Sequence, residues 1–420
     1  MALLRDKTIV LGLSGGIACY KAVELVRALL KEGAKPRVVM TRAARQFVTP
    51  LTLQTLSGHP VATDTFDLTQ ESEIGHIRLA DSADVLLIAP ATANVIAKLA
   101  HGIADDLLTT VALAAHGPIV VAPAMNVNMY KNPVVQANLA RLRELGFRIA
   151  DPEAGFLACG YEGEGRLASE PAVIEAVKAA LTPQVLAGER VLVSAGPTRE
   201  AIDPVRFVSN RSSGKMGFAV AAAARRRGAA VVLVTGPTAL AAPPGVERLP
   251  VTTASEMRDA VLAREPWASV VVMTAAVADY RVANPARQKI KKSDGTLSLS
   301  LEQTSDILSE VGARRRVDRL LVGFAAETEH GIEHARRKLR EKRLDLIVLN
   351  DVSQGDAGFD VDTNRVWLIG AEGEAEGWPL LDKEEVAERL MERVAAMRRA
   401  GKAAPARADG KSRRERASES

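Results

Sequence analysis

Residues 118–122, Pro-Ile-Val-Val-Ala, run directly into residues 123–130, Pro-Ala-Met-Asn-Val-Asn-Met-Tyr. An apolar run that ends in proline and then in side-chain amides is typical of a buried strand that stops at the carboxyl edge of a sheet. Ligands of open α/β sheets bind at that edge, where Asn126 offers two N–H donors and one acceptor to a carboxylate. The alternative is that Asn126 caps the following helix, because Asn is a favoured N-cap residue.

The chain has 420 residues, more than one ordinary hydrophobic core accommodates, so we expect two domains. Hydrophobic residues make up 47% and charged residues 25%, the balance of a soluble globular protein. We find no apolar stretch of the roughly 20 residues that a membrane helix needs, and we expect no signal peptide. Two cysteines do not make a disulfide scaffold, which favours a cytoplasmic location.

The formal net charge of +4 is concentrated at the end of the chain. Residues 400–420 hold six Lys or Arg against three Asp or Glu, so three of the four surplus charges lie there. This segment has no aromatic residues, and we predict residues 398–420 to be a disordered basic tail. Since the rest of the chain is nearly neutral, we expect no nucleic-acid partner and no membrane partner.

Residues 7–13, Lys-Thr-Ile-Val-Leu-Gly-Leu, predict a buried strand, and residues 14–18, Ser-Gly-Gly-Ile-Ala, predict the turn into an amphipathic helix that runs to about residue 31. A glycine-rich turn lets the backbone approach a phosphate, which the N–H groups at the start of a helix bind. The spacing is not GxGxxG, so the dinucleotide fingerprint is absent. An ordinary tight turn is the alternative.

Further strands are predicted at residues 37–40, 84–89 and 119–122, and they end in small or hydroxyl residues such as Thr41 and Thr92. Strands and helices that alternate at this spacing predict a doubly wound, three-layer α/β fold with a parallel sheet. The small polar strand ends would converge on one edge of that sheet. Such an edge would suit a flat phosphorylated cofactor.

Two reactive side chains lie outside the predicted strands. His76, in Glu-Ile-Gly-His-Ile-Arg-Leu (residues 73–79), would be a base near neutral pH in a cleft, and a structural or exposed histidine elsewhere. Cys159 lies in Leu-Ala-Cys-Gly-Tyr-Glu-Gly-Glu-Gly-Arg (residues 157–166), whose glycines predict a mobile loop. An exposed thiol on such a flap is a candidate acid or nucleophile.

His76, the Pro-Ala-Met-Asn-Val-Asn-Met motif with Asn126, and the Ala-Cys-Gly-x-x-Gly-x-Gly-Arg motif with Cys159 resemble the flavin-dependent cysteine decarboxylases. Within that family they are most similar to the phosphopantothenoylcysteine decarboxylase half of the bifunctional coenzyme A biosynthesis flavoproteins. Tyr130 departs from the pattern, since the family has Trp after the second Met. Both side chains are amphipathic aromatics, so the departure concerns packing rather than chemistry.

The resemblance implies an FMN cofactor, which supplies the redox chemistry. It implies that the cysteine unit of the substrate is oxidised to a thioaldehyde, loses carbon dioxide and is reduced again as an ene-thiolate. His76 would be the base of the oxidative half, Asn126 would hold the substrate carboxylate, and Cys159 would donate the final proton. The residues implied to contact FMN are Ser14, Gly15, Gly16, Thr41, Ala91 and Thr92.

After a linker at residues 181–188, the pattern restarts with a predicted strand at residues 190–194. A polar loop, Val-Ser-Asn-Arg-Ser-Ser-Gly-Lys-Met-Gly (residues 208–217), opens a helix that runs to about residue 227. The loop contains Ser-Ser-Gly-Lys but lacks the first glycine and the final hydroxyl of a P-loop, so we reject that motif. A polar loop at a helix N-terminus is still a good anion site.

Charged residues follow the later strands of this half. A predicted strand at residues 270–274 leads to Asp279, and Lys-Ile-Lys-Lys follows at residues 289–292. An acidic residue and a lysine cluster fit a Mg²⁺–triphosphate site, with a solvated basic turn as the alternative. Lys338 and Lys342 share one face of a helix at i, i+4, where they either bind phosphates or face solvent.

Five motifs of this half resemble the phosphopantothenate–cysteine ligases: Ser-Asn-Arg-Ser-Ser-Gly-Lys-Met-Gly, Ala-Ala-Val-Ala-Asp-Tyr, Lys-Ile-Lys-Lys, Gly-Phe-Ala-Ala-Glu-Thr and Leu-Asn-Asp-Val. The resemblance implies that the substrate carboxylate attacks CTP to give an acyl-cytidylate, from which the cysteine amine displaces CMP. Nothing in the residues alone separates CTP from ATP. Asn210 and Lys289 would act on the acyl-cytidylate and its formation, and Asp279 would bind Mg²⁺. The implied CTP contacts are Met273, Asp279, Lys289, Ser305, Asp306, Ile307, Leu308, Phe324, Lys338 and Lys342.

We therefore predict a bifunctional enzyme with an FMN-dependent decarboxylase at residues 1–189 and a CTP-dependent ligase at residues 190–397. The ligase would join 4′-phosphopantothenate to cysteine, and the decarboxylase would convert the product to 4′-phosphopantetheine. The family implies a homo-oligomer, with trimers of the first domain and dimers of the second that a dodecamer would combine.

Three alternatives to this prediction were weighed. A flavoprotein acting on peptidyl cysteine and a prenyl-flavin synthase would not need the ligase half. A binding or regulatory protein that keeps the flavin fold and only ligase activity would be expected to lack the motif around Cys159.

Overall fold

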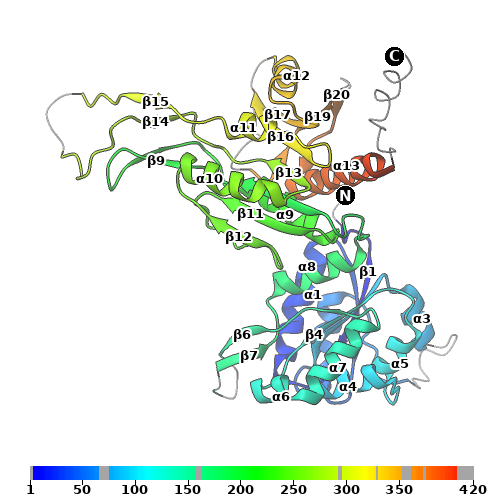
Figure 1. Ribbon diagram of the computed structural model, residues 1–420. Helices are drawn as coiled ribbons and strands as arrows, with labels where there is room; N and C mark the ends of the chain where they lie inside the picture. The colour runs from blue at the N-terminus through cyan, green and yellow to red at the C-terminus, as the bar shows by residue number, and fades with distance from the viewer. Residues whose placement is uncertain are drawn as a thin grey trace, which may run out of the picture. The chain divides into compact units, whose positions relative to one another are not determined.

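The computed structural model describes residues 3–65, 75–156, 160, 162–291, 296–327, 330–351, 361–371 and 375–403 (Figure 1). The chain divides into two compact units, unit 1 over Met1–Pro183 and unit 2 over Gln184–Ser420. Each unit has its own sheet and its own hydrophobic core. In the part of the chain that the structure describes, no helix is long and apolar enough to span a membrane.

Unit 1 is built on a five-stranded parallel sheet in the order β2-β1-β3-β4-β5. The central strands are apolar along their whole length because helices cover both faces, so successive side chains are buried on opposite sides. Ile9 and Leu11 of β1 face one core, and Val10 faces the other. The strands are β1 (Thr8–Leu13), β2 (Lys35–Met40), β3 (Val85–Ala91), β4 (Ile119–Pro123) and β5 (Arg148–Ile149).

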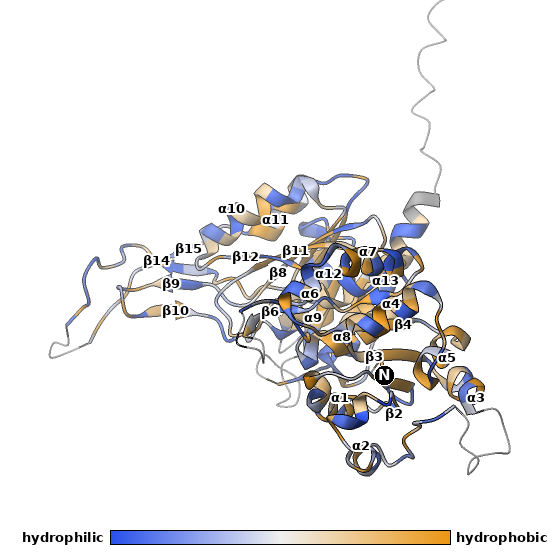
Figure 2. Ribbon diagram, turned by 90° about the horizontal axis from the view of Figure 1, so that it is seen from below, coloured by the Kyte–Doolittle hydropathy of each residue, from blue (hydrophilic) through white to orange (hydrophobic). Residues whose placement is uncertain are grey.

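Two layers of helices complete unit 1. On one face lie α1 (Ala22–Lys31) and α8 (Glu170–Leu181), and Figure 2 shows hydrophobic and hydrophilic residues together along α1, as expected for an amphipathic helix. On the other face lie α4 (Ala93–His101), α5 (Leu107–Ala114) and α7 (Pro133–Glu144). The remaining helices are η1 (Ile17–Lys21), η2 (Ala44–Gln46), α2 (Pro50–Ser57), α3 (Gly75–Ser82) and α6 (Val127–Lys131).

Unit 2 is built on an eight-stranded sheet in the order β12-β11-β8-β13-β16-β17-β19-β20. The strands from β12 to β17 are parallel, while β19 and β20 extend the sheet in antiparallel fashion. The strands are β8 (Arg190–Ala195), β11 (Ala230–Thr235), β12 (Glu247–Pro250), β13 (Val270–Met273), β16 (Leu320–Glu327), β17 (Leu346–Asp351), β19 (Val366–Gly370) and β20 (Ala375–Gly377).

Helices cover both faces of this sheet as well, which confirms the doubly wound, three-layer α/β prediction for both units. On one face lie α9 (Lys215–Arg226) and α13 (Lys383–Ala403). On the other lie α10 (Ala254–Arg264), α11 (Ile307–Ala313) and α12 (Gly331–Glu341), with η4 (Glu265–Trp267) following α10. Smaller pairings are β9 (Arg199–Ala201) with β10 (Phe207–Ser209), β14 (Tyr280–Val282) with β15 (Leu301–Gln303), and β18 (Thr363–Asn364) with β21 (Leu381–Asp382).

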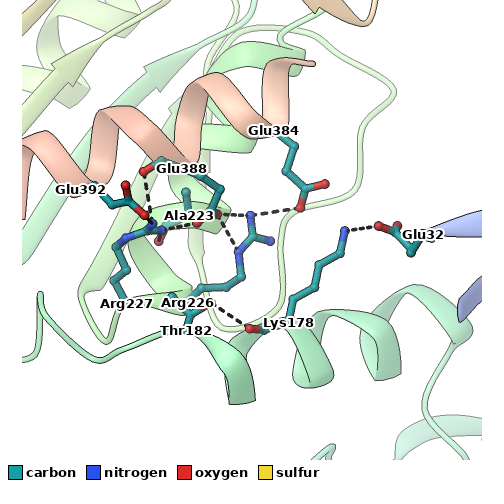
Figure 3. Close-up of polar contacts among 9 residues, drawn as sticks. All are labelled: Glu32, Lys178, Thr182, Ala223, Arg226, Arg227, Glu384, Glu388 and Glu392. Carbon is teal, nitrogen blue, oxygen red and sulfur yellow. Dashed lines mark hydrogen bonds and ion pairs between the residues drawn. The ribbon is translucent and has the colours of Figure 1, made fainter. Parts of the chain in front are cut away.

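Buried ion pairs fasten helices together in both units (Figure 3). Glu388 of α13 accepts from Arg226 at 2.7 Å and from Arg227 at 2.5 Å, and all three side chains are buried. In unit 1, Lys178 of α8 lies 3.0 Å from Glu32, which follows α1. Because the carboxylate of Glu388 is shared by two buried guanidinium groups, its loss would leave their charge compensated only in part, by Glu384 at 3.2 Å from Arg226 and by Glu392 at 3.2 Å from Arg227.

Candidate functional site

A cavity of about 390 Å³ lies in unit 1 at the carboxyl ends of β1, β3 and β4. The chain leaves β1 toward β2 on one side and reaches β3 on the other, so this is the switch point of the sheet, where ligands of doubly wound folds bind. The volume is within the range of small-molecule sites. The residues that line the cavity directly after the strands include Gly15, Gly16, Thr92, Ala124, Met125 and Asn126.

Of the two glycines after β1, Gly15 is required by close packing, whereas Gly16 has room for a Cβ. A Cβ on Gly15 would lie 2.3 Å from the Cβ of Ala43, and one on Gly16 would lie 3.5 Å from Cγ2 of Thr92. The turn therefore brings bare backbone to the cavity next to η1, as the phosphate-turn prediction requires. These residues fit the phosphate and ring of a flavin nucleotide, because backbone and hydroxyl groups approach the ligand without steric hindrance.

Three other residues predicted to contact the cofactor are buried beside the cavity. The hydroxyl of Ser14 donates to the Pro90 carbonyl at 2.8 Å and accepts from the backbone N–H of Thr92 at 2.8 Å. Thr41 accepts from the backbone N–H of Ala44 at 3.2 Å, and Ala91 is fully buried. Ser14 thus holds Thr92 against the end of β1, while Gly15, Gly16 and Thr92 face the cavity.

Asn126 combines the two interpretations of its motif. Its Oδ1 accepts from the backbone N–H of Asn128 at 2.8 Å, so it caps α6, and the same residue lines the cavity. The cap fixes the side chain at the end of β4, and its amide N–H₂ is the kind of donor that a substrate carboxylate would need. Capping and substrate binding are therefore compatible.

The motif around Cys159 ends in β7 (Glu162–Arg166), which pairs with β6 (Glu153–Phe156) as the hairpin visible in Figure 1. The hairpin docks on the loop after β4, where the Met125 N–H donates to the Gly165 carbonyl at 2.9 Å. Gly165 has a φ of +133°, and a Cβ there would lie 2.5 Å from the Met125 carbonyl oxygen. Glycine is therefore needed for this approach. Cys159 itself lies outside the described residues.

His76 is the second residue of α3 and does not line this cavity. Among the described residues, its Nδ1 is buried without a hydrogen-bond partner. A buried ring nitrogen without a partner is unusual, which favours a functional over a structural interpretation of His76.

Sequence reasoning missed two cations that line the cavity, Lys21 and Arg166. Burial lowers the pKa of Lys21, and the charge of Arg166 lowers it further, whereas Glu153 opposes the shift. Lys21 ends η1, which begins directly after the glycine pair, and Arg166 ends the Cys159 motif. Both cations stand next to motifs that the sequence analysis identified, and this proximity could have predicted that they line the cavity.

In unit 2, loops from three parts of the chain meet at the carboxyl end of β13. Asn210 donates its Nδ2 to the Val277 carbonyl at 2.9 Å, and the Ala278 N–H donates to Oγ1 of Thr198 at 2.9 Å. Thr304, just before α11, donates its backbone N–H to the Asp279 carbonyl at 2.9 Å. Asn210 and Asp279, from separate motifs, are therefore held by the same short segment.

Most of the predicted nucleotide contacts also come together. Met273 ends β13 and is in register with Gly323, next to Phe324 on β16. Leu308 packs against that glycine: its Cδ2 would be 3.1 Å from a Cβ on Gly323. Asp306 caps α11 and lies 2.8 Å from Lys342 at the end of α12. Ser305 and Ile307 flank Asp306, so these residues form one cluster at the sheet edge.

Lys338 pairs with a residue that sequence reasoning did not select, Glu327 at the end of β16. Its Nζ lies 2.7 Å from Oε1 of Glu327, and Nδ1 of His334 lies 3.4 Å from Oε2. Burial alone would raise the pKa of Glu327, but the hydrogen bonds and positive charges of Lys338 and His334 together outweigh burial, and the pKa is lowered. The pair is 11 residues apart in sequence, so no local pattern pointed to it.

Asp279 and Lys289 are both exposed. In the described ranges, no three His, Cys, Asp or Glu side chains gather as metal ligands. A Mg²⁺ ion at Asp279 would therefore depend on the phosphates of a nucleotide for its other ligands, as is usual for this ion.

Two protein-family models match the chain. The flavoprotein model matches residues 2–182, and the model of the DNA/pantothenate metabolism flavoprotein C-terminal domain matches residues 186–397.

Curated relatives match nearly the whole chain. It is 47% identical over 399 residues to the coenzyme A biosynthesis bifunctional protein CoaBC of Bacillus subtilis, covering 94% of this chain and 98% of the relative. It is 46% identical over 395 residues to the protein of the same name from Escherichia coli, covering 93% and 97%. A solved structure, the C-terminal domain of such a protein, is 42% identical, with a TM-score of 0.45 and coverage of 52% and 99%.

Proposed function

Because the chain belongs to the family of the coenzyme A biosynthesis bifunctional protein CoaBC, we propose that it is a bifunctional enzyme catalysing two consecutive steps of coenzyme A biosynthesis. The ligase, at residues 190–397, joins 4′-phosphopantothenate to cysteine. The decarboxylase, at residues 1–189, converts the product to 4′-phosphopantetheine. Two strand-edge sites of different chemistry in one chain support this proposal.

For the ligase step we assign CTP as co-substrate and Mg²⁺ as its metal. Asp279 carries the metal together with the nucleotide phosphates, and the cluster around Asp306 and Lys342 holds the nucleotide. Lys289 places a positive charge against the α-phosphate, where negative charge develops as the carboxylate attacks. Asn210 then holds the acyl-cytidylate while the cysteine amine displaces CMP.

For the decarboxylase step we assign FMN to the cavity at the switch point of unit 1. When bound, FMN supplies the two-electron redox chemistry that makes the carboxylate a leaving group. Asn126 holds that carboxylate through its amide N–H₂. His76, which does not line the cavity of its own chain, takes a proton from the cysteine unit in the oxidative half at the cavity of a neighbouring copy in the homo-oligomer. Cys159, in the sequence motif that ends at Arg166, donates a proton in the reductive half.

We further propose that the protein acts in the cytoplasm as a homo-oligomer, with trimers of decarboxylase domains and dimers of ligase domains combined into a dodecamer. The alternative, a regulatory flavin-fold protein with ligase activity alone, is disfavoured by the preformed cavity and by the docked strand Glu162–Arg166 with which the Cys159 motif ends.

A visible absorbance spectrum of the purified protein and an assay of both products test the proposal. With 4′-phosphopantothenate, cysteine, Mg²⁺ and CTP, the protein should be yellow and release both pyrophosphate and carbon dioxide. The Cys159→Ser variant should release pyrophosphate but not carbon dioxide, and ATP in place of CTP should give little pyrophosphate. If the protein is colourless and releases pyrophosphate but no carbon dioxide, the proposed decarboxylase activity is wrong and only the ligase activity stands.

A further inference from the structure

Asp203 is a buried carboxylate just after β9, on the loop that connects β9 to β10. Its Oδ1 accepts from the backbone N–H groups of Val205 and Arg206, each at 2.8 Å. Its Oδ2 accepts from Nε of Arg206 at 2.9 Å and from Nη2 at 2.5 Å. These bonds hold the carboxylate and the guanidinium as one rigid pair.

This pair reaches across the fold to a second segment. Oδ2 of Asp203 also accepts from the backbone N–H of Ile290 at 3.1 Å, and Nη2 of Arg206 donates to the Ile290 carbonyl at 2.8 Å. Both backbone polar groups of Ile290 are thus satisfied by a single ion pair that lies more than 80 residues earlier in the sequence. We call the group of Asp203, Arg206 and Ile290 the latch.

A second hydrogen bond fixes the same segment four residues before Ile290. The backbone N–H of Ala286 donates to the Ile202 carbonyl at 2.9 Å. Residues 287–289 therefore form a short loop between two fixed points, and Lys289 is the residue next to the latch. A long, exposed lysine has several rotatable bonds, so fixing its backbone removes part of the freedom that would otherwise have to be lost when it binds.

We propose that Asp203 is a positioning residue of the ligase: it sets the place of Lys289 by holding Ile290 through the latch. This inference rests on the role of Lys289 proposed above. Asp203 itself does not act on the substrate. Its carboxylate keeps the ion pair formed because Arg206 and three backbone N–H groups all favour the charged form, and Arg206 holds the pKa of Asp203 well below its usual range.

The alternative is that Asp203 only stabilises unit 2. Glu388 provides the matched control, since it is also a buried carboxylate paired with arginine in the same unit but holds α9 to α13. Replacing either with the isosteric amide removes one buried charge. A purely structural carboxylate would lower the melting temperature and leave kcat unchanged, whereas a positioning residue would lower kcat as well.

The experiment uses the full-length protein and three variants: Asp203→Asn, Glu388→Gln and Lys289→Gln. Pyrophosphate release is followed with 4′-phosphopantothenate, cysteine, CTP and Mg²⁺, and carbon dioxide release is followed separately with 4′-phosphopantothenoylcysteine. We expect D203N to lower kcat for pyrophosphate release about 10- to 100-fold with little change in KM for CTP, because a small misplacement of a catalytic group has that effect. E388Q should lower the melting temperature with kcat nearly unchanged.

The outcomes separate the latch from the proposed function. If K289Q releases pyrophosphate at the rate of the unmodified protein, the role of Lys289 is wrong and the latch inference falls with it. If K289Q is impaired while D203N keeps a normal kcat, only the latch inference is overturned. Decarboxylation should be unchanged in D203N and K289Q, which reports that unit 1 is intact in each preparation.

Hydrogen exchange keeps the inference testable if D203N does not fold. In the unmodified protein the amide of Ile290 should exchange more slowly than those of Lys289 and Lys291, because it donates to a buried carboxylate. In D203N or another destabilised latch variant, that difference should disappear while β13 stays protected. Unprotected exchange of Ile290 in the unmodified protein would overturn the proposal.

Discussion

In each unit the candidate site lies at the carboxyl ends of the parallel strands of that unit's own sheet, yet the two sites are built from different chemical groups. In unit 1 the site combines glycine backbone, hydroxyls and one amide with two cations, Lys21 and Arg166, and Gly165 and Gly15 allow backbone segments to touch. In unit 2 the corresponding edge carries ion pairs, of which Asp306–Lys342 and Glu327–Lys338 are the nearest to the strand ends.

The difference follows from the ligands that the two sites are proposed to hold. A largely neutral flavin ring needs shape and backbone contacts, so its site is rigid and preformed. A nucleotide triphosphate carries concentrated negative charge, so its site needs lysines. Without ligand, carboxylates keep those lysines in place, and the nucleotide must compete with them. The first site should therefore be sensitive to added volume and the second to removed charge.

The largest expected effect concerns the ion pairs that hold helices together within each unit. Glu388→Gln should lower the free energy of unfolding of unit 2 by about 3 kcal/mol, because it leaves Arg226 and Arg227 buried without their shared anion. Glu32→Gln is the counterpart in unit 1, and its partly exposed pair with Lys178 should cost about 1 kcal/mol or less. Urea unfolding followed by circular dichroism measures both, and equal losses would contradict the comparison.

Added volume in the hairpin should have the next largest effect. Gly165→Ala places a Cβ against the Met125 carbonyl oxygen and should lower decarboxylation about 100-fold, because the hairpin can no longer dock at the cavity. Ligation should be unaffected. Gly146→Ala is the control, since Gly146 also has a positive φ, +88°, but has no atom within 4 Å of the new Cβ. If both variants lose the same activity, backbone strain rather than docking is responsible.

Removing charge from the second site should have a moderate effect. Lys342→Met should raise KM for CTP about 10-fold, the loss expected for one charge-assisted hydrogen bond to a phosphate. The effect is limited because Lys342 already bonds to Asp306 before the nucleotide arrives. Arg337→Met, an exposed change on the same helix, should leave KM unchanged. A comparable rise in both variants would indicate general electrostatic attraction instead of direct contact.

The smallest expected effect is that of pH on KM for CTP. For Asp306 and Glu327, burial raises the pKa. The lysine partners, Lys342 and Lys338, outweigh burial only together with the hydrogen bonds from Ser309 to Asp306 and from His334 to Glu327, so each folded-state pKa is lowered. Their contribution to stability is therefore fully present above the unfolded pKa values and is lost as the pH falls through the folded ones. KM for CTP should change less than about twofold between about pH 6 and pH 8 through these groups. Steady-state ligation across that range measures it, and a steep rise of KM near pH 6 would contradict the assignment.

Local sequence patterns were sufficient for the α/β fold of both units and for the position of several site residues. The apolar run before Asn126 predicted a strand end, and β4 ends at Pro123 with Asn126 capping α6. The glycines at 15 and 16 predicted a close-packed turn, which the contact with Ala43 explains. These predictions succeeded because strand ends and turns depend on neighbouring residues.

Contacts between distant segments were outside the reach of those patterns. The pairing of Lys338 with Glu327, the docking of Gly165 on Met125 and the latch between Asp203 and Ile290 each join residues that only the fold brings together. The sequence by itself determined which chemical groups stand at each strand end, because periodicity and turn residues are local properties. Only the tertiary structure decided which of these groups meet, since the order of strands in the sheets sets those distances.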